Sequence, residues 1–117
     1  MYKIVDINDF VCLRYNDSNI EKEVYIQLTD KNSEEIDRIG AFAIKQIPYN
    51  SSTGKNILGK KVGMNLRLNN INFKIKAIYD KNDLLEETIN FFEDMGMSEE
   101  ASLYKTQLVK RKNKNKR

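Results

Sequence analysis

The spacing of apolar residues changes once along this chain, near residue 83, and that change limits the folds available to it. Before it, apolar and polar residues alternate, as in "EVYIQL" (23–28) and "FKIKAIY" (73–79), which is typical of strands with one buried face. After it, four apolar residues recur at helical spacing: Leu84, Leu85, Ile89 and Phe92. Strands followed by helices indicate an α+β fold.

The alternating part of the chain predicts strands joined by tight turns. Five strands are expected, at residues 10–15, 23–28, 41–47, 64–68 and 73–79. The first two would form a hairpin across the turn-rich connector 16–22. The last two would form another across "NNIN" (69–72), because Asn tolerates the left-handed backbone of tight turns. The third strand would end at Pro48.

A short helix is expected between the second and third of these strands, at residues 33–40. Ser33 is a suitable N-cap for it, and Gly40 is a suitable terminator. The segment is long enough for one or two helical turns.

The C-terminal part predicts a helical pair, a hairpin over residues 82–112. Its first helix would open at Asp83, with Glu86 three residues later, and would close at Gly96. The second helix would start at Ser98 and bury three residues on one side: Ala101, Tyr104 and Leu108.

The stretch "GKNILGKK" (54–61) has the glycine–lysine spacing of a phosphate-binding loop. Ile57 and Leu58 are large where backbone amides should wrap a phosphate, and Lys61 stands where a magnesium-binding Ser or Thr is needed. We therefore expect a short helix whose two apolar residues plug the concave face of a curved antiparallel sheet, with its lysines turned outward. Two glycines mark its expected ends: Gly54 and Gly59.

The composition argues against an enzyme. The chain has no histidine, and Cys12 is its only cysteine, so an intramolecular disulfide, a cysteine zinc site and histidine catalysis are excluded. No catalytic residue, metal or cofactor is predicted. The N-terminal residues lack the features of a signal peptide and no stretch approaches the length of a membrane span, so we expect a cytoplasmic protein without membrane contact.

Charge is distributed in blocks. Residues 40–79 hold seven Lys or Arg and no acid, and residues 80–100 hold eight acids against one lysine. The last thirteen residues hold seven bases and no acid, and residues 113–117 are expected to be a disordered basic tail. One function open to such a chain is that of a nucleic-acid-binding adaptor, which uses the basic 40–79 surface and makes weak contact through the tail. Few aromatic residues could stack on bases in that surface: Phe42, Tyr49, Phe73 and Tyr79.

The stretch from residue 50 to residue 79, "NSSTGKNILGKKVGMNLRLNNINFKIKAIY", resembles the C-terminal domain of the Gre transcript-cleavage factors, and the likeness extends over about residues 5–79. It implies a domain at residues 1–81 like an FK506-binding protein, in which a curved antiparallel sheet wraps a short helix. In the family this domain docks on bacterial RNA polymerase near the secondary channel. Three positions depart from the family pattern, which usually has Asp, Pro and Asp there: Asn50, Ser52 and Met64.

The resemblance implies a non-catalytic modulator of transcription elongation that binds RNA polymerase. The family's N-terminal coiled coil, which carries the cleavage activity, is expected to be missing here. Contacts with polymerase would come from the loop and short helix matching the family motif. The candidate residues are Asn50, Ser51, Ser52, Thr53, Lys55, Lys60 and Lys61.

The turn of the helical hairpin is acidic. It gathers four carboxylates: Glu93, Asp94, Glu99 and Glu100. One hypothesis is a short acidic finger that enters the polymerase channel; the other is that acids solvate the turn and favour the start of the second helix. Four large residues near the turn are expected to pack the pair onto the sheet or onto a second chain, which would give a homo-oligomer: Phe91, Phe92, Met95 and Met97.

Overall fold

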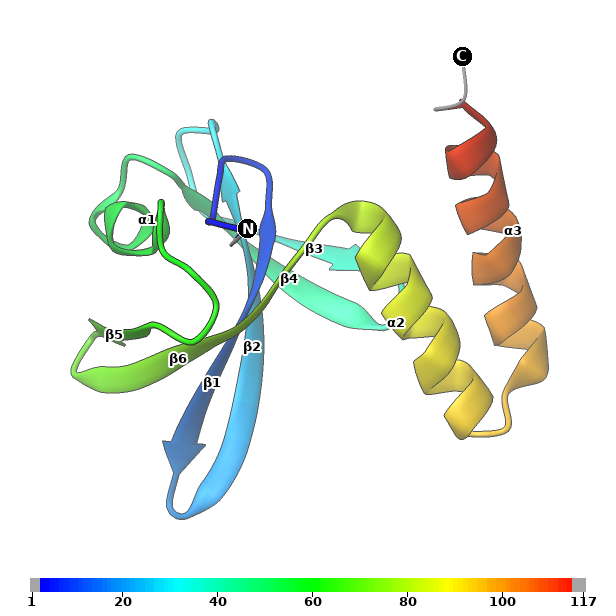
Figure 1. Cartoon of the computed structure of the whole chain (residues 1–117), viewed down its shortest axis with the longest axis horizontal. Coiled ribbons are helices and arrows are strands. Elements are labelled where there is room, and N and C mark those ends of the chain that lie inside the picture. Colours follow the sequence, from blue (N-terminus) through cyan, green and yellow to red (C-terminus); the bar gives the residue numbers. More distant parts are fainter. Residues whose placement is uncertain (1–2, 115–117) are drawn as a thin grey trace. The chain divides into compact units, whose positions relative to one another are not determined.

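The computed structural model describes residues 3–114, which form two compact units (Figure 1). The sheet unit consists of the chain up to Asp37 together with Ala43–Tyr79. The helical unit consists of Arg38–Phe42 and the chain from Asp80 onward. Each unit is described by itself.

Six strands form one mixed sheet in the order β3-β4-β2-β1-β6-β5, and the structure is therefore α+β. Their bounds are β1 Phe10–Asp17, β2 Ile20–Thr29, β3 Glu35–Ile39, β4 Phe42–Pro48, β5 Asn65–Leu68 and β6 Ile71–Tyr79. β1 pairs antiparallel with β2 and with β6, and β5 pairs antiparallel with β6, but β4 runs parallel to β2. The expectation of an antiparallel sheet is thus wrong at this one pair, because β3 carries the chain back before β4 joins β2.

The β1–β2 and β5–β6 hairpins close through two-residue turns in left-handed backbone. Ser18 and Asn19 have φ of 50° and 67°, and Asn69 and Asn70 have φ of 51° and 65°. Left-handed backbone at both central residues matches the right-handed twist of the flanking strands. The prediction of an asparagine turn is confirmed, but the turn consists of Asn69 and Asn70 alone, since β6 already begins at Ile71. The first hairpin is longer than expected, since its strands continue through most of the 16–22 connector.

The predicted helix at residues 33–40 is wrong, because this segment contains β3. In a strand, residues three apart face opposite ways, and accordingly Ile36 is 74% exposed while Ile39 is 8% exposed. Gly40, with φ of 59°, forms a turn into β4 rather than ending a helix. Pairing with β4 outweighs the weak helical signal of the isolated segment.

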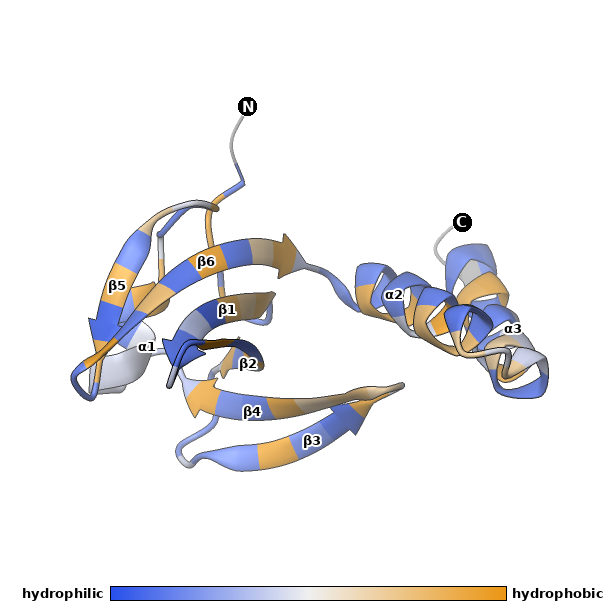
Figure 2. Ribbon diagram, turned by 90° about the horizontal axis from the view of Figure 1, so that it is seen from below, coloured by the Kyte–Doolittle hydropathy of each residue, from blue (hydrophilic) through white to orange (hydrophobic). Residues whose placement is uncertain are grey.

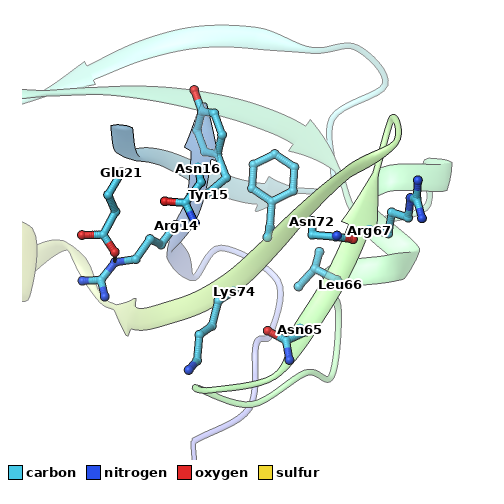
Figure 3. A pocket seen from close by; sticks show the side chains of 10 residues that line it. Arg14, Tyr15, Asn16, Glu21, Asn65, Leu66, Arg67, Asn72 and Lys74 are labelled. Atoms are coloured by element: carbon cyan, nitrogen blue, oxygen red, sulfur yellow. Dashed lines mark ion pairs between the residues drawn. The ribbon is translucent and has the colours of Figure 1, made fainter. Parts of the chain in front are cut away.

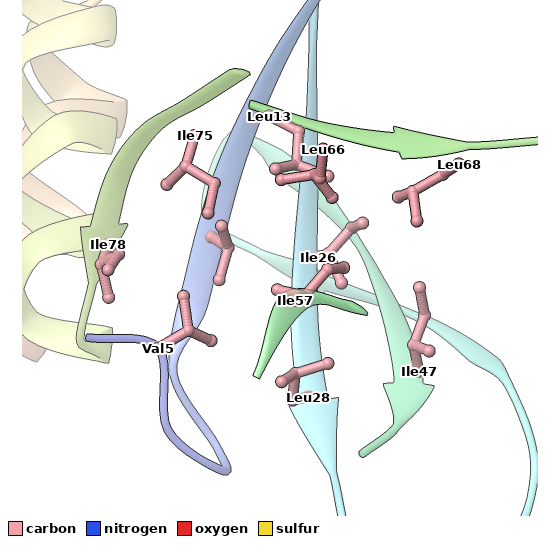
Figure 4. Packing of buried hydrophobic residues seen from close by; sticks show 11 residues of the cluster. Val5, Leu13, Ile26, Leu28, Ile47, Ile57, Leu66, Leu68, Ile75 and Ile78 are labelled. Carbon is pink, nitrogen blue, oxygen red and sulfur yellow. The ribbon is translucent and has the colours of Figure 1, made fainter. Parts of the chain in front are cut away.

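The core of the sheet unit is built around α1 (Ser52–Ile57). Ile57 is fully buried, and Figure 4 shows it among Val5, Ile26 and Leu28. Leu58, just after the helix, is partly buried against the same core. The prediction that Ile57 and Leu58 are packing residues is confirmed. The cluster comprises Val5, Val11, Leu13, Ile26, Leu28, Ile47, Ile57, Leu66, Leu68, Ile75 and Ile78.

An irregularity in β6 changes which of its residues reach this core. Figure 2 shows hydrophobic and hydrophilic residues alternating along the strand. Cys12 pairs with Ala77 but Leu13 pairs with Ile75, so Lys76 is the extra residue of a β-bulge. Ile78 therefore joins Ile75 in the core, whereas uninterrupted alternation from Ile75 would place Ala77 on that face.

The helical unit contains α2 (Lys81–Asp94) and α3 (Ser98–Lys114). Asp80 caps α2, in a reciprocal capping box with Asp83, so the predicted opening at Asp83 with Glu86 is three residues late. Gly96 has φ of 74° and ends the helix as predicted. Two residues of the segment expected as tail, 113 and 114, belong to α3, and residues 115–117 lie outside the described residues.

The two helices pack side by side through a small core. The rings of Phe92 and Tyr104 stack with centroids 5.6 Å apart. Phe91 and Met95, expected to be packing residues, are 46% and 59% exposed. Within residues 3–114, no helix has the length and apolar character needed to cross a bilayer. The buried cluster of the helical unit comprises Leu85, Ile89, Ala101 and Leu108.

Candidate functional site

The loop before α1 is organised by Ser51. Its Oγ accepts a 3.0 Å hydrogen bond from the N–H of Gly54 and donates one of 2.7 Å to the carbonyl of Pro48. Ser51 is thus the N-cap of α1, and both hydrogen-bonding capacities of its hydroxyl serve the fold. It was predicted as a contact residue, but its hydroxyl has an intramolecular function.

Gly54 allows α1 to lie close to the end of β4. A Cβ at this position would be 2.2 Å from the carbonyl oxygen of Pro48, well inside van der Waals contact. Gly54 was predicted to mark one end of the helix, but it is buried within α1. Gly59, with φ of 80°, follows the helix as predicted. The N–H groups of Gly54, Lys55 and Leu58 all bond within this segment, which supports the exclusion of a phosphate loop.

The remaining predicted contact residues lie on or beside α1 and differ in exposure. Asn50, Ser52, Lys55 and Lys61 are exposed, whereas Thr53 and Lys60 are half-buried. The backbone around Lys60 is held by the N-terminal segment, because the N–H of Val5 donates to the Lys60 carbonyl at 2.8 Å. Over residues 3–114, neither Lys55 nor Lys60 forms an ion pair.

A second candidate site is a hollow of about 760 Å³ in the sheet unit, which we call the β1–β6 groove. It lies where the pairing of β1 with β6 ends at Arg14 and Lys74. Figure 3 shows Arg14 and Glu21 at one end of the hollow and Arg67 at the other. The groove is lined by Arg14, Tyr15, Asn16, Glu21, Asn65, Leu66, Arg67, Asn72, Phe73 and Lys74.

One end of the groove is an ion-pair network. Arg14 forms ion pairs with Glu21 at 3.1 Å and with Glu23 at 3.4 Å, and Lys76 pairs with Glu23 at 2.6 Å. The hydrogen bond from Lys76 holds the pKa of Glu23 below its ordinary value, and Arg14 adds to this effect. Two other cations of the groove, Arg67 and Lys74, form no ion pair within the described part of the chain.

Aromatic and amide side chains complete the groove. The rings of Tyr15 and Phe73 are 5.1 Å apart at 56°, and both residues are half-buried. Tyr15 lies in β1, outside the acid-free stretch 40–79 in which stacking aromatic residues were expected. The only signal that could have found it is the pairing of β1 with β6, which the sequence does not state.

The acidic turn between α2 and α3 has a structural explanation for part of its charge. Glu93 pairs with Lys105 of α3 at 2.9 Å. Glu99 and Glu100 lie in the first turn of α3, where negative charge stabilises a helix, and Asp94 is the last residue of α2. In residues 3–114 no group of three or more His, Cys, Asp or Glu is placed to hold a metal ion.

The single cysteine lies in β1, between Val11 and Leu13. Cys12 is fully buried, and burial raises the pKa of its thiol. The side chain interacts with Tyr25, whose own pKa is raised by burial and by that contact. A buried thiol with a raised pKa is a poor nucleophile, so Cys12 is a packing residue.

Comparisons with known proteins give no further assignment. No family model, no curated protein and no solved structure matches this chain. What the protein does is therefore inferred from the segment around α1 and from the β1–β6 groove.

Proposed function

We propose that the sheet unit is a domain like the C-terminal domain of the Gre factors, with a fold like that of FK506-binding proteins. The protein would bind bacterial RNA polymerase near its secondary channel and modulate transcription without catalysis. Four neighbouring strands, β2-β1-β6-β5, are antiparallel and share a core with α1, which accords with this proposal.

The observation that carries the proposal is that the apolar residues of "GKNILGKK" are buried while a lysine of the same motif is exposed. Ile57 is fully buried in the core, so the apolar half of the motif serves the fold. Lys55, in the same helix, is exposed and has no ion-pair partner among residues 3–114. An unpaired cation on a rigid helix is available to an acidic partner surface, where charge complementarity speeds association.

The candidate contact residues differ in exposure and in their hydrogen bonds. Ser51 and Gly54 build the loop and its helix cap, so they would act by positioning. Asn50 and Lys55 are exposed and would make direct contact, and Lys60 is half-buried beside them in the chain. We propose that Asn50, Ser52, Lys55, Lys60 and Lys61 form the polymerase-binding surface.

A pull-down with bacterial core RNA polymerase tests the proposal. Lys55→Glu and Lys60→Glu should each reduce retention of polymerase, because they reverse a charge on the contact surface. Lys110→Glu makes the same change at an exposed position of α3 and should retain polymerase like the unmodified chain. Thermal unfolding of all variants would check that the fold is intact.

Two outcomes would contradict the proposal. One is the absence of any retention by the unmodified protein. The other is equal retention by the Lys55, Lys60 and Lys110 variants, which would show that binding uses another surface.

A further inference from the structure

We infer that the face of β1, β6 and β5 turned away from the core binds the phosphate backbone of nucleic acid, through Lys74 and Arg67 together with nearby amide side chains. The Tyr15 and Phe73 rings lie on the opposite face and take no part. The site is separate in sequence from the segment proposed to contact polymerase, and the inference does not depend on that proposal.

Alternation along the strands decides which side chains share this face. Leu66 lies in the core and Phe73 packs against it, and the Tyr15 ring contacts that of Phe73. Successive side chains of a strand point to opposite faces, so the sequence neighbours of these residues lie on the other side of the sheet. Figure 3 shows Lys74 and Asn65 extending away from Tyr15. The polar sheet face, as we call it, comprises Arg14, Asn16, Glu21, Glu23, Asn65, Arg67, Asn72, Lys74 and Lys76.

The polar sheet face has an excess of positive charge. It carries four cations against two acids. Both acids pair with Arg14 or Lys76. Lys74 and Arg67 are exposed and form no ion pair in the described part of the chain. These two side chains are therefore available to an external anion.

Lys74 and Arg67 are neighbours on the sheet. Lys74 is paired with Asn65 across β6 and β5, and Arg67 is the second residue after Asn65. Such diagonal neighbours on one face have Cα atoms about 7–8 Å apart, within reach of each other for long side chains. Both cations can therefore contact phosphates of one backbone, with release of the counterions of those phosphates.

Amide side chains extend the surface beside the two cations. Asn16, Asn65 and Asn72 are exposed, and their side chains form no hydrogen bond with another part of residues 3–114. An amide NH₂ group donates hydrogen bonds, and Asn is among the residues that contact the phosphates and sugars of nucleic acids. The cations and the amides can therefore bind the same backbone.

The composition of this face favours nucleic acid over an acidic protein. Protein interfaces are usually anchored by aromatic or other large side chains in well-packed pockets. The polar sheet face presents no aromatic or large apolar side chain, because the Tyr15 and Phe73 rings lie on the other side of the sheet. The last thirteen residues of the chain are a second acid-free basic segment, as is common in proteins that bind nucleic acid.

Contacts of this kind do not read sequence. Phosphates carry no direct information on the bases, so affinity should be the same for unrelated sequences. A duplex has the higher charge density and releases more counterions for each contact than a single strand does. We therefore expect a duplex to bind at least as tightly as its separate strands.

Fluorescence anisotropy tests the inference, with labelled DNA duplexes of two unrelated sequences and with their separate strands. Affinity should fall steeply between about 50 and 200 mM salt. Lys74→Glu and Arg67→Glu should each weaken binding about fivefold or more, equally for both sequences. Each should also lower the slope of log affinity against log salt by about one, because each removes a phosphate contact.

Two variants are matched controls. Tyr15→Leu removes a ring from the opposite face and should leave affinity unchanged. Lys55→Glu reverses a charge in the same acid-free stretch but outside the polar sheet face. It should leave nucleic-acid binding unchanged while it reduces polymerase retention, and Lys74→Glu should do the reverse, so failure of one proposal is distinguishable from failure of the other. Lys74→Ala replaces Lys74→Glu if the thermal unfolding midpoint shows that the latter is unfolded.

Several results would overturn the inference. One is the absence of binding at about 50 mM salt. Another is unchanged affinity in both the Lys74 and Arg67 variants, including the case in which deletion of residues 110–117 abolishes binding and assigns it to the C-terminal residues. Weaker binding by Tyr15→Leu, or a strong preference for one sequence, would contradict recognition through the backbone. Competition by polyglutamate as effective as that by DNA would identify an acidic protein as the partner instead.

Discussion

The hydroxyl of Thr88 accepts a hydrogen bond of 3.3 Å from the backbone N–H of Ala41, although the two residues lie 47 positions apart in the chain. Thr88 is fully buried in α2, and its hydroxyl also donates a 2.8 Å bond to the carbonyl of Leu84. The preceding residue of the turn, Gly40, lies so close that a Cβ there would be 2.3 Å from Oγ1 of Thr88. Both partners belong to the helical unit, so this bond holds the Arg38–Phe42 segment to α2.

Replacement of Thr88 by Val should lower the free energy of unfolding by about 1–2 kcal/mol, because it leaves the N–H of Ala41 without its partner. Thr88→Ser keeps the hydroxyl and serves as control. Gly40→Ala should cost about 2 kcal/mol or more, since it adds a clash to an unfavourable left-handed backbone. Chemical denaturation measures all three, and equal stability of the Val and Ser variants would argue against the hydrogen bond.

The close approach of α1 to Pro48 gives a second prediction. Gly54→Ala should destabilise the protein by about 2 kcal/mol or more, because its Cβ would meet backbone rather than a movable side chain. Gly59→Ala is the matched control: it has positive φ but open space around it, so a loss of only about 1 kcal/mol is expected. Ser51→Ala should cost about 1 kcal/mol through loss of the N-cap. A Gly54 variant as stable as the Gly59 variant would show that the contact relaxes freely.

The asparagine turn between β5 and β6 predicts opposite effects of two substitutions at one position. Asn70 has φ of 65°, so Asn70→Gly should preserve or slightly raise the thermal midpoint, whereas Asn70→Val should cost about 1–2 kcal/mol. Asn72→Val, in the extended backbone of β6, should change stability little. If Val were tolerated equally at both positions, the left-handed turn would not be maintained in solution.

Glu23 should make stability depend on pH in the acid range. Its folded pKa is lowered from the ordinary 4.5, mainly by the hydrogen bond from Lys76. A lowered pKa stabilises the fold above the unfolded value of 4.5, and this contribution disappears as the pH falls through the folded pKa. The unmodified protein should therefore exceed Glu23→Gln by up to about 1 kcal/mol at neutral pH, and the difference should shrink below about pH 4.5.

Urea denaturation between about pH 3 and pH 7 measures this difference. The control is Glu87→Gln, which removes a charge from an exposed residue of α2 that has no charge partner among residues 3–114. A difference between the Glu23 variant and the unmodified protein that stays constant with pH would place the effect in packing instead of charge.

Patterns of neighbouring residues in the sequence were sufficient to predict much of the fold. Alternation identified the strands that flank the asparagine turn, and helical spacing identified the buried stripe of α2. The burial of Ile57 followed from its size and its position between glycines. These features depend on neighbours in sequence, which is why sequence reasoning could reach them.

The misinterpreted features depend on partners distant in sequence. β3 is a strand because β4 lies beside it, and Ile78 is buried because Lys76 is bulged against β1. The groove depends in the same way on the point where β1 and β6 separate, so neither Tyr15 nor Lys74 stood out in the sequence. The predicted polymerase-contact residues lie in one contiguous stretch of sequence. Their hydrogen bonds and their exposure could be learned only from the structure.

The pairing of β1 with β6 also determines when, during synthesis, the second edge of β1 becomes protected from pairing with other polypeptides. β1 can form its hairpin with β2 early, but its other edge has no partner until residues 74–79 have been synthesised. During that interval Val11 and Leu13, both fully buried in the finished fold, stand on an unpaired strand edge, which is a template for aggregation. A nascent chain that stalls before Tyr79 is therefore at risk of pairing with other polypeptides, and this risk ends when β6 has been made and has paired with β1.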